Sequence, residues 1–121
     1  MKAIGYFALF VLAAANIQYY TVKDEDIEAV VANITILQSY VDCLLDRTPC
    51  SETLIRVTPE CMQNACLRCT PLQKKRYWQF LEGVRIHLPE EYDNYRKYYD
   101  PDNKYFDALI KELSKYKTLV N

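Results

Sequence analysis

The stretch ECMQNACLRC, residues 60–69, places Cys61, Cys66 and Cys69 within nine residues of one another. Cysteines this close together can ligate zinc, form a redox pair, or belong to a disulfide framework. Upstream, the stretch CLLDRTPC at residues 43–50 adds Cys43 and Cys50, which brings the total to five. Because five is odd, at least one cysteine is free or pairs with another molecule. The compartment in which the chain folds decides among the three interpretations.

The N-terminal segment has the features of a secretory signal peptide. Lys2 precedes an apolar run over residues 3–15, which ends in three alanines that form an A-x-A cleavage pattern. A run of ~13 residues is too short to span a bilayer, which takes roughly 20; the alternative is a buried N-terminal helix. We expect a signal peptide at 1–15, with cleavage as late as residue 18 as the alternative, and a single domain at 16–121. The mature chain is then secreted and extracellular, without membrane insertion after cleavage.

The composition excludes several function classes. The net charge is −1 with both signs mixed, so there is no basic patch for nucleic acid. The chain has only two glycines, which disfavours turn-rich β folds and phosphate-binding loops. One histidine, with no G-x-S-x-G and no H-E-x-x-H, offers no catalytic constellation. The chain is therefore predicted not to be an enzyme and to need no cofactor.

Apolar residues after residue 26 recur with helical spacing, which predicts an all-α domain of five to seven short helices. The first two are expected at 27–32 and from 34, with Asn33 as a cap between them, and Pro49 after the second. Thr58 is expected to cap a third helix that begins at Pro59, and Thr70 a fourth that begins at Pro71. A fifth is expected over 89–99, and a last helix with Asp100 as its cap.

The cysteines allow a zinc site, a redox pair or disulfides, and the predicted helices help to choose among these. Cys61, Cys66, Cys69 and His87 can be drawn as a zinc site, but a second close pair is missing and oxidation competes for the thiols. A redox C-x-x-C requires a strand before it, and none precedes Cys66. An oxidising compartment favours disulfides. Bridges between neighbouring cysteines, one around Pro49 and one before Thr70, would each fasten the end of a helix.

Several blocks of the sequence together resemble the insect chemosensory proteins, also called the olfactory-segment-D-like or pherokine family. The family signature is C-x6-C-x18-C-x2-C, and CLLDRTPC followed by CLRC is similar to it. The blocks at 57–75 and 80–101 extend the similarity over nearly the whole chain, with the family's Tyr-Asp-Pro motif at residues 99–101. The resemblance implies the disulfides Cys43–Cys50 and Cys66–Cys69 and leaves Cys61 over.

The chain departs from the family pattern at four places. Fifteen residues instead of eighteen separate Cys50 from Cys66, which shortens the segment SETLIR at 51–56 and puts its short helix in question. Tyr92 stands where relatives carry tryptophan, and Trp78 stands at an aliphatic position, so the outer end of a channel would be shaped differently. Cys61 replaces a small residue. We expect a buried free thiol in a monomer; the alternative is a dimer linked through Cys61.

The resemblance implies about six short amphipathic helices around an apolar channel that takes long-chain alcohols, aldehydes, esters or fatty acids. The candidate ligand-binding residues are apolar wall positions and three tyrosines at the mouth: Ile36, Leu37, Tyr40, Val41, Leu44, Met62, Phe80, Leu81, Val84, Tyr92, Tyr95 and Tyr99. Each of them can equally be an ordinary core or surface residue.

The expected function is therefore that of a secreted carrier of small hydrophobic ligands, such as odorants, pheromones or lipid-like molecules. The alternative is a secreted developmental or defence-responsive factor that acts through a protein partner. Asn33 also begins the sequon Asn-Ile-Thr, a glycosylation signal; the alternative is a helix cap alone.

Overall fold

The structure, a computed structural model, describes residues 17–23 and 25–120. This part of the chain contains helices and no strand, which confirms the all-α prediction. The expected signal peptide lies outside the described residues. The six helices are α2 (Ile27–Ala32), α3 (Ile34–Leu44), α4 (Glu52–Asn64), α5 (Pro71–His87), α6 (Pro89–Tyr99) and α7 (Phe106–Ser114). None of the helices in this part is both long enough and apolar enough to span a lipid bilayer.

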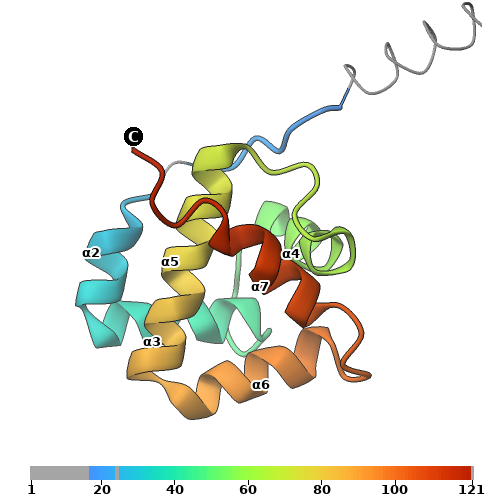
Figure 1. The fold of residues 1–121 in the computed structure, drawn as a ribbon. Coiled ribbons are helices and arrows are strands. Elements are labelled where there is room, and N and C mark those ends of the chain that lie inside the picture. Colours follow the sequence, from blue (N-terminus) through green and yellow to red (C-terminus); the bar gives the residue numbers. More distant parts are fainter. Residues whose placement is uncertain (1–16, 24, 121) are drawn as a thin grey trace, which may run out of the picture.

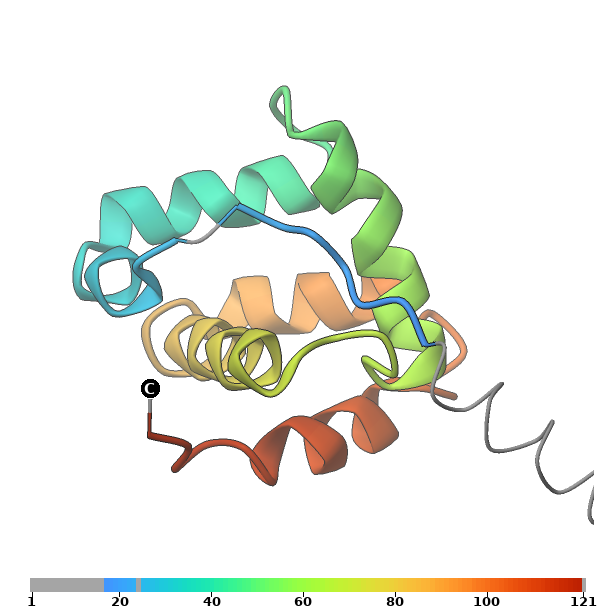
Figure 2. The same ribbon diagram turned by 90° about the horizontal axis from the view of Figure 1, so that it is seen from above.

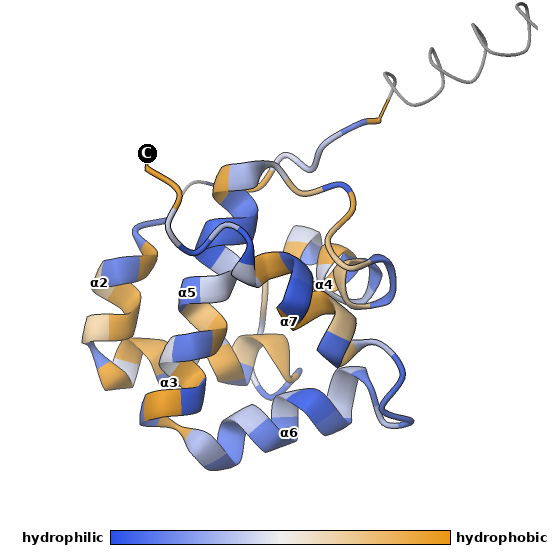
Figure 3. Cartoon of the chain, viewed as in Figure 1, coloured by the Kyte–Doolittle hydropathy of each residue, from blue (hydrophilic) through white to orange (hydrophobic). Residues whose placement is uncertain are grey.

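Helix α5 is the centre of the arrangement (Figure 1). It contacts α2, α3, α6 and α7, while α4 bridges α3 and α7. Seen from above, α3 and α7 lie on opposite sides of α5 and α6, and α4 stands across one end (Figure 2). Hydrophobic residues recur along α2 and α3, whereas α6 is mostly hydrophilic (Figure 3).

Two predicted helix starts are confirmed by their hydrogen bonds. The Asn33 side chain accepts from the backbone N–H groups of Thr35 and Ile36, so it caps α3 directly after α2 ends. Thr70 and Gln73 form a reciprocal capping box at the start of α5, with Pro71 at its first position. These side chains satisfy N–H groups that have no partner inside their helix.

The predicted start of the third helix is wrong. Helix α4 begins at Glu52, and the Ser51 hydroxyl accepts from the N–H of Leu54, so the segment 51–56 is helical after all. Pro59 lies inside this helix, where it cannot donate the usual backbone hydrogen bond. The helix continues past Pro59 because its next turn buries Cys61 and Met62 against the core.

The last helix also begins later than expected, at Phe106. Asp100 still satisfies its first turn from a distance, since its carboxylate accepts from the N–H groups of Lys104, Tyr105 and Phe106 at 2.8 to 2.9 Å. Asp100 is itself buried, and burial raises the pKa of its carboxyl, but the three backbone hydrogen bonds together bring that pKa below its ordinary value. One side chain therefore organises the whole connection between α6 and α7.

The two predicted disulfides are present. Cys43–Cys50 joins the end of α3 to the loop that precedes α4, with the Cα atoms 4.8 Å apart. Cys66–Cys69 closes the connection between α4 and α5, with the Cα atoms 5.2 Å apart. Both bridges act at helix junctions and leave the helix interiors free to pack. Cys61 is free and buried.

Candidate functional site

The predicted wall residues gather in one hydrophobic cluster. Leu37, Val41, Tyr95 and Met62 are almost fully buried, and α3, α4, α5 and α6 all contribute to the cluster. The remaining buried or partly buried members of the predicted set are Leu44, Phe80, Leu81, Val84, Tyr40, Tyr92 and Tyr99. Ile36 is the exception, because its side chain is 42% exposed. The structure therefore brings all of the candidates together except this one.

Three tyrosine hydroxyls lie inside or at the edge of this cluster. The hydroxyls of Tyr77 and Tyr95 are hydrogen-bonded to each other, and the Tyr99 hydroxyl donates to the backbone carbonyl of Leu44. Burial raises the pKa of all three, to about 12 for Tyr99. Near neutral pH these hydroxyls are uncharged, so they can give or accept hydrogen bonds without placing a charge in the core.

A hollow of about 150 Å³ opens at the edge of the cluster, between α5, α6 and α7. Leu81, Trp78 and Ile110 give it an apolar floor and walls, and Tyr92 closes one side. Tyr92 is held by Phe106, which meets it edge to face with ring centroids 5.5 Å apart. Burial raises the pKa of the Tyr92 hydroxyl, so this polar group at the hollow is uncharged near neutral pH.

The charged residues at the hollow are paired. The Arg85 guanidinium donates to Glu82, with Nε 2.5 Å from Oε2, and both side chains line the rim. The hydrogen bond to Glu82, followed by the charge of Glu82, raises the pKa of Arg85. Since each charge has its partner, the rim carries no net charge from this pair. The hollow therefore suits an uncharged apolar group better than an ion.

Sequence reasoning missed Glu82, Arg85 and Ile110 as site residues. It named Trp78 and Tyr92 as departures that would together reshape the outer end of a channel, and the structure puts both at one hollow. A signal was available on α5, because residues 78, 81, 82 and 85 have i, i+3, i+4, i+7 spacing and so share one face. The contribution of Ile110 from α7 had no local signal.

The cysteines and the histidine do not form the zinc site that was considered. The Sγ atoms of Cys61, Cys66 and Cys69 all lie within 4.8 Å of one another, but two of them are bonded in the disulfide. His87, at the end of α5, is exposed and is not part of this group. Cys61 is 3% exposed, a position that suits a small apolar core residue better than an intermolecular bridge.

Asn33 is exposed, and its side-chain oxygen is used as the α3 cap. A glycan would be attached to the other atom of the amide, the nitrogen, so capping and glycosylation are compatible. Glycosylation at Asn33 stays a prediction.

The chain is similar in sequence to known insect proteins. The sequence model of the insect pheromone-binding family A10/OS-D matches residues 19–107, which is well over half of the chain. Ejaculatory bulb-specific protein 3 of Drosophila melanogaster is 27% identical over 99 residues, which are 78% of this chain and 79% of that protein. Allergen Tha p 1 of Thaumetopoea pityocampa is 28% identical over 95 residues, 76% of this chain and 75% of that protein. The matched region contains α2 to α6, both disulfides and the start of α7.

Proposed function

Because the chain belongs to the insect pheromone-binding family A10/OS-D, a family of binding proteins and not of enzymes, we propose that it is a secreted carrier of small, uncharged, long-chain ligands. The ligand enters at the hollow between α5, α6 and α7. Its chain extends from there towards the buried tyrosines. The carrier acts as a monomer, and its chemistry is non-covalent binding alone.

The observation that supports this proposal is the hollow lined by Trp78, Tyr92 and the buried Leu81, in which the charged lining residues Glu82 and Arg85 are paired with each other. An apolar cavity of about 150 Å³ holds a molecule of about the size of benzene. A long-chain ligand needs more room, so we expect side chains at the edge of the core to move when it binds. Tyr92 and Ile110 are only partly buried and can move at the least cost.

Chain length should then set the affinity. Each methylene group buried contributes ~0.8 kcal/mol, which is about a fourfold change in Kd. The hollow alone accommodates only the first few carbons. We therefore expect affinity to rise by about fourfold per added methylene and to level off where the helices can separate no further. The neutral tyrosine hydroxyls offer hydrogen bonds to an alcohol or aldehyde head group.

Trp78 provides the assay, because it is the only tryptophan of the chain and it lines the hollow. Straight-chain alcohols of increasing length are titrated against the mature protein while the tryptophan emission is followed. Native mass spectrometry of the same samples counts the bound molecules. We expect one bound alcohol, a change in the Trp78 emission, and the length dependence described above.

Tyr92→Ala and Tyr98→Ala form a matched pair on the same helix. Tyr92 lines the hollow, whereas Tyr98 is 53% exposed and does not. We expect Tyr92→Ala to change alcohol affinity by about fivefold or more, and Tyr98→Ala to leave it nearly unchanged. Binding without any change in Trp78 emission, and with equal affinities for the two variants, would mean that the ligand lies elsewhere. No binding of any alcohol by a folded protein would favour the alternative role, in which a protein partner is recognised.

A further inference from the structure

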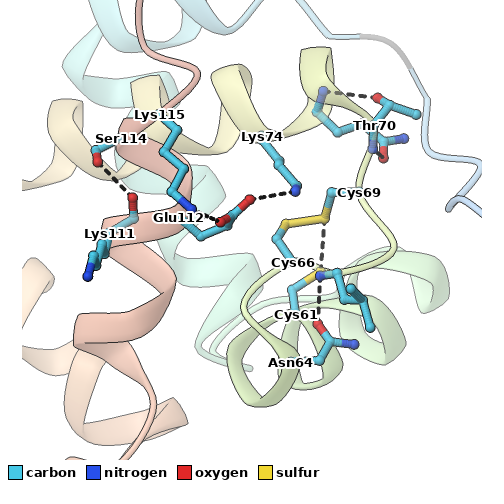
Figure 4. Close-up of polar contacts among 12 residues, drawn as sticks. Cys61, Asn64, Cys66, Cys69, Thr70, Lys74, Lys111, Glu112, Ser114 and Lys115 are labelled. Atoms are coloured by element: carbon cyan, nitrogen blue, oxygen red, sulfur yellow. Dashed lines mark hydrogen bonds and ion pairs between the residues drawn. A yellow bond between two sulfur atoms is a disulfide. The ribbon is translucent and has the colours of Figure 1, made fainter.

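Cys61 lies directly beside the disulfide that closes the connection between α4 and α5. Its Sγ atom is 3.5 Å from the Sγ of Cys69, and Cys69 is bonded to Cys66 (Figure 4). All three residues are buried, with exposed fractions of 3%, 6% and 0% for Cys61, Cys69 and Cys66. A free thiol is therefore held in contact with a disulfide sulfur and kept from solvent by the same core.

Tyr20, from the segment that precedes α2, packs over this cluster. Its backbone N–H donates to the carbonyl of Arg68 at 3.0 Å, and its carbonyl accepts from the Gln73 side chain at 2.8 Å. The Arg68 guanidinium lies 4.8 Å from the centre of the Tyr20 ring. The Tyr20 hydroxyl is buried and forms no hydrogen bond of ordinary geometry with the described residues, although Glu60 and Asn64 lie near enough to act on its pKa.

We propose that Cys61, Cys66 and Cys69 form an internal thiol–disulfide exchange site, in which Cys69 pairs with either of the other two. When the connection between α4 and α5 opens locally, the Cys61 thiol gives its proton to hydroxide or another base in solution, and its Sγ turns into line with the Cys66–Cys69 bond. The electron pair of its sulfur then forms a bond to Cys69 Sγ while the Cys66–Cys69 bond breaks. The electron pair of the broken bond leaves on Cys66 as a thiolate, which takes up a proton. The exchange needs no oxidant or reductant, because one disulfide and one thiol are present before and after it.

The surroundings of Cys61 control how fast this occurs, since the thiolate is the attacking species. Burial raises the pKa of Cys61 to about 11; the nearby Tyr20 hydroxyl lowers this pKa, the charge of Glu60 raises it, and the charge of Arg68 lowers it. Tyr77 of α5 and Tyr95 of α6 lie near enough to this thiol to interact with it electrostatically, and they are uncharged near neutral pH. Exchange is accordingly slow at neutral pH, and the unused hydroxyl of Tyr20 is the group placed to stabilise the thiolate.

The exchange changes the connection that it acts on. Ala65 and Cys66 both adopt the left-handed backbone conformation, with φ of 54° and 60°, which is uncommon for residues other than glycine. In the present pairing, the bridge to Cys69 holds Cys66 in that conformation. Pairing of Cys69 with Cys61 ties the connection to α4 itself and releases Cys66. The Cys43–Cys50 bridge lies at another junction and takes no part.

Differential labelling of the mature, folded protein tests this site. Samples are incubated at pH values from about 7 to about 10, stopped and denatured in acid, and treated with N-ethylmaleimide under conditions that suppress further exchange. The disulfides are then reduced and alkylated with iodoacetamide, and fragmentation mass spectrometry reads which cysteine carries each label. We expect maleimide on Cys61 in the starting form and on Cys66 in the exchanged form. The rate of appearance on Cys66 should rise by about tenfold per pH unit below the pKa of Cys61.

Two variants separate exchange from general loss of structure. Cys61→Ala should abolish the maleimide label on Cys66, because the attacking thiol is gone. Tyr20→Phe should slow its appearance several-fold at a given pH while far-ultraviolet circular dichroism stays unchanged. Label that remains on Cys61 alone at every pH and time would overturn the proposal. Maleimide label that appears on Cys43 or Cys50 at the same rate as on Cys66 would also overturn the proposal. The same holds for maleimide label on Cys66 in the Cys61→Ala variant.

Discussion

Glu91 fastens α6 to the chain around α3, and Glu91→Gln should weaken the fold in a pH-dependent manner. The Glu91 carboxylate accepts from Arg47 with Nη2 3.0 Å from Oε1, and from the side chains of Gln38 and Asn94 at 2.5 and 2.8 Å. Arg47, foremost, lowers the pKa of Glu91 to about 2, with smaller contributions from Asn94 and Gln38, although burial opposes them. Glutamine keeps the shape of the side chain but removes its charge.

The size of the effect follows from the pKa. A carboxyl held at about 2 against an ordinary value of 4.5 corresponds to at most ~3.4 kcal/mol of stability. The Glu91 side chain is only 14% exposed, but its Arg47 partner is 42% exposed, so solvent screens part of the interaction. We therefore expect Glu91→Gln to lower the free energy of unfolding by ~1–2 kcal/mol at pH 7.

The sign of the pH dependence is fixed by the lower pKa in the folded state. The ionised carboxylate stabilises the folded protein fully above about pH 4.5, and the contribution is lost as the pH falls towards about 2. The difference between wild type and Glu91→Gln in urea unfolding, followed by circular dichroism, should shrink over this range. Glu90→Gln is the control, because Glu90 is exposed and shares the first turn of α6. A difference that persists unchanged at about pH 2, or equals that of the control, would refute the reasoning.

Three further changes probe the packing. Gly83→Ala should lower the free energy of unfolding by up to ~2 kcal/mol in urea unfolding, because the new Cβ would lie 2.7 Å from both γ-methyls of Val31 and the helix propensity of alanine offsets only part of this. In a Val31→Ala background the same change should cost less. An equal loss in both backgrounds would contradict the clash. Asp100→Ala should lower the melting temperature clearly, because three backbone N–H groups at the start of α7 lose their acceptor; an unchanged melting temperature would show that another group replaces it. Tyr95→Phe should cost ~1–3 kcal/mol by stranding the Tyr77 hydroxyl, whereas the variant with both tyrosines replaced by phenylalanine should cost less than the two single losses summed; additive losses would show that the two hydroxyls act independently.

Local signals predicted the helix starts well where the cap and its helix are neighbours in sequence. Asn33 and Thr70 are such caps, and each lies within three residues of the N–H groups that it serves. The Thr58-Pro59 pair carried the same kind of signal and misled, because the Ser51 hydroxyl caps an earlier start and burial of Cys61 holds the helix together beyond the proline. Propensity is a weak preference that tertiary packing overrides.

At the candidate site, too, local sequence signals predicted some features and tertiary packing decided the others. Periodicity identified the inward faces of α3 and α5, and with them one part of the core, namely Leu37, Val41 and Leu44 on α3 and Phe80, Leu81 and Val84 on α5. It could not bring Trp78, Tyr92 and Ile110 together, because these residues come from three different helices and no spacing relates them. The spacing of the cysteines also could not predict the 3.5 Å contact between the Sγ atoms of Cys61 and Cys69, although both residues lie in the same short stretch.

The sequence by itself determined the helical class, the caps at Asn33 and Thr70, and, through its family resemblance, the two disulfide pairings. Only the tertiary structure decided that Ile36 faces solvent, that α4 continues through Pro59, and that the hollow opens between α5, α6 and α7. The physical reason is that the spacing of apolar residues says which face of a helix is buried, but not which other helix covers it. That choice depends on how all the side chains fill the interior at once.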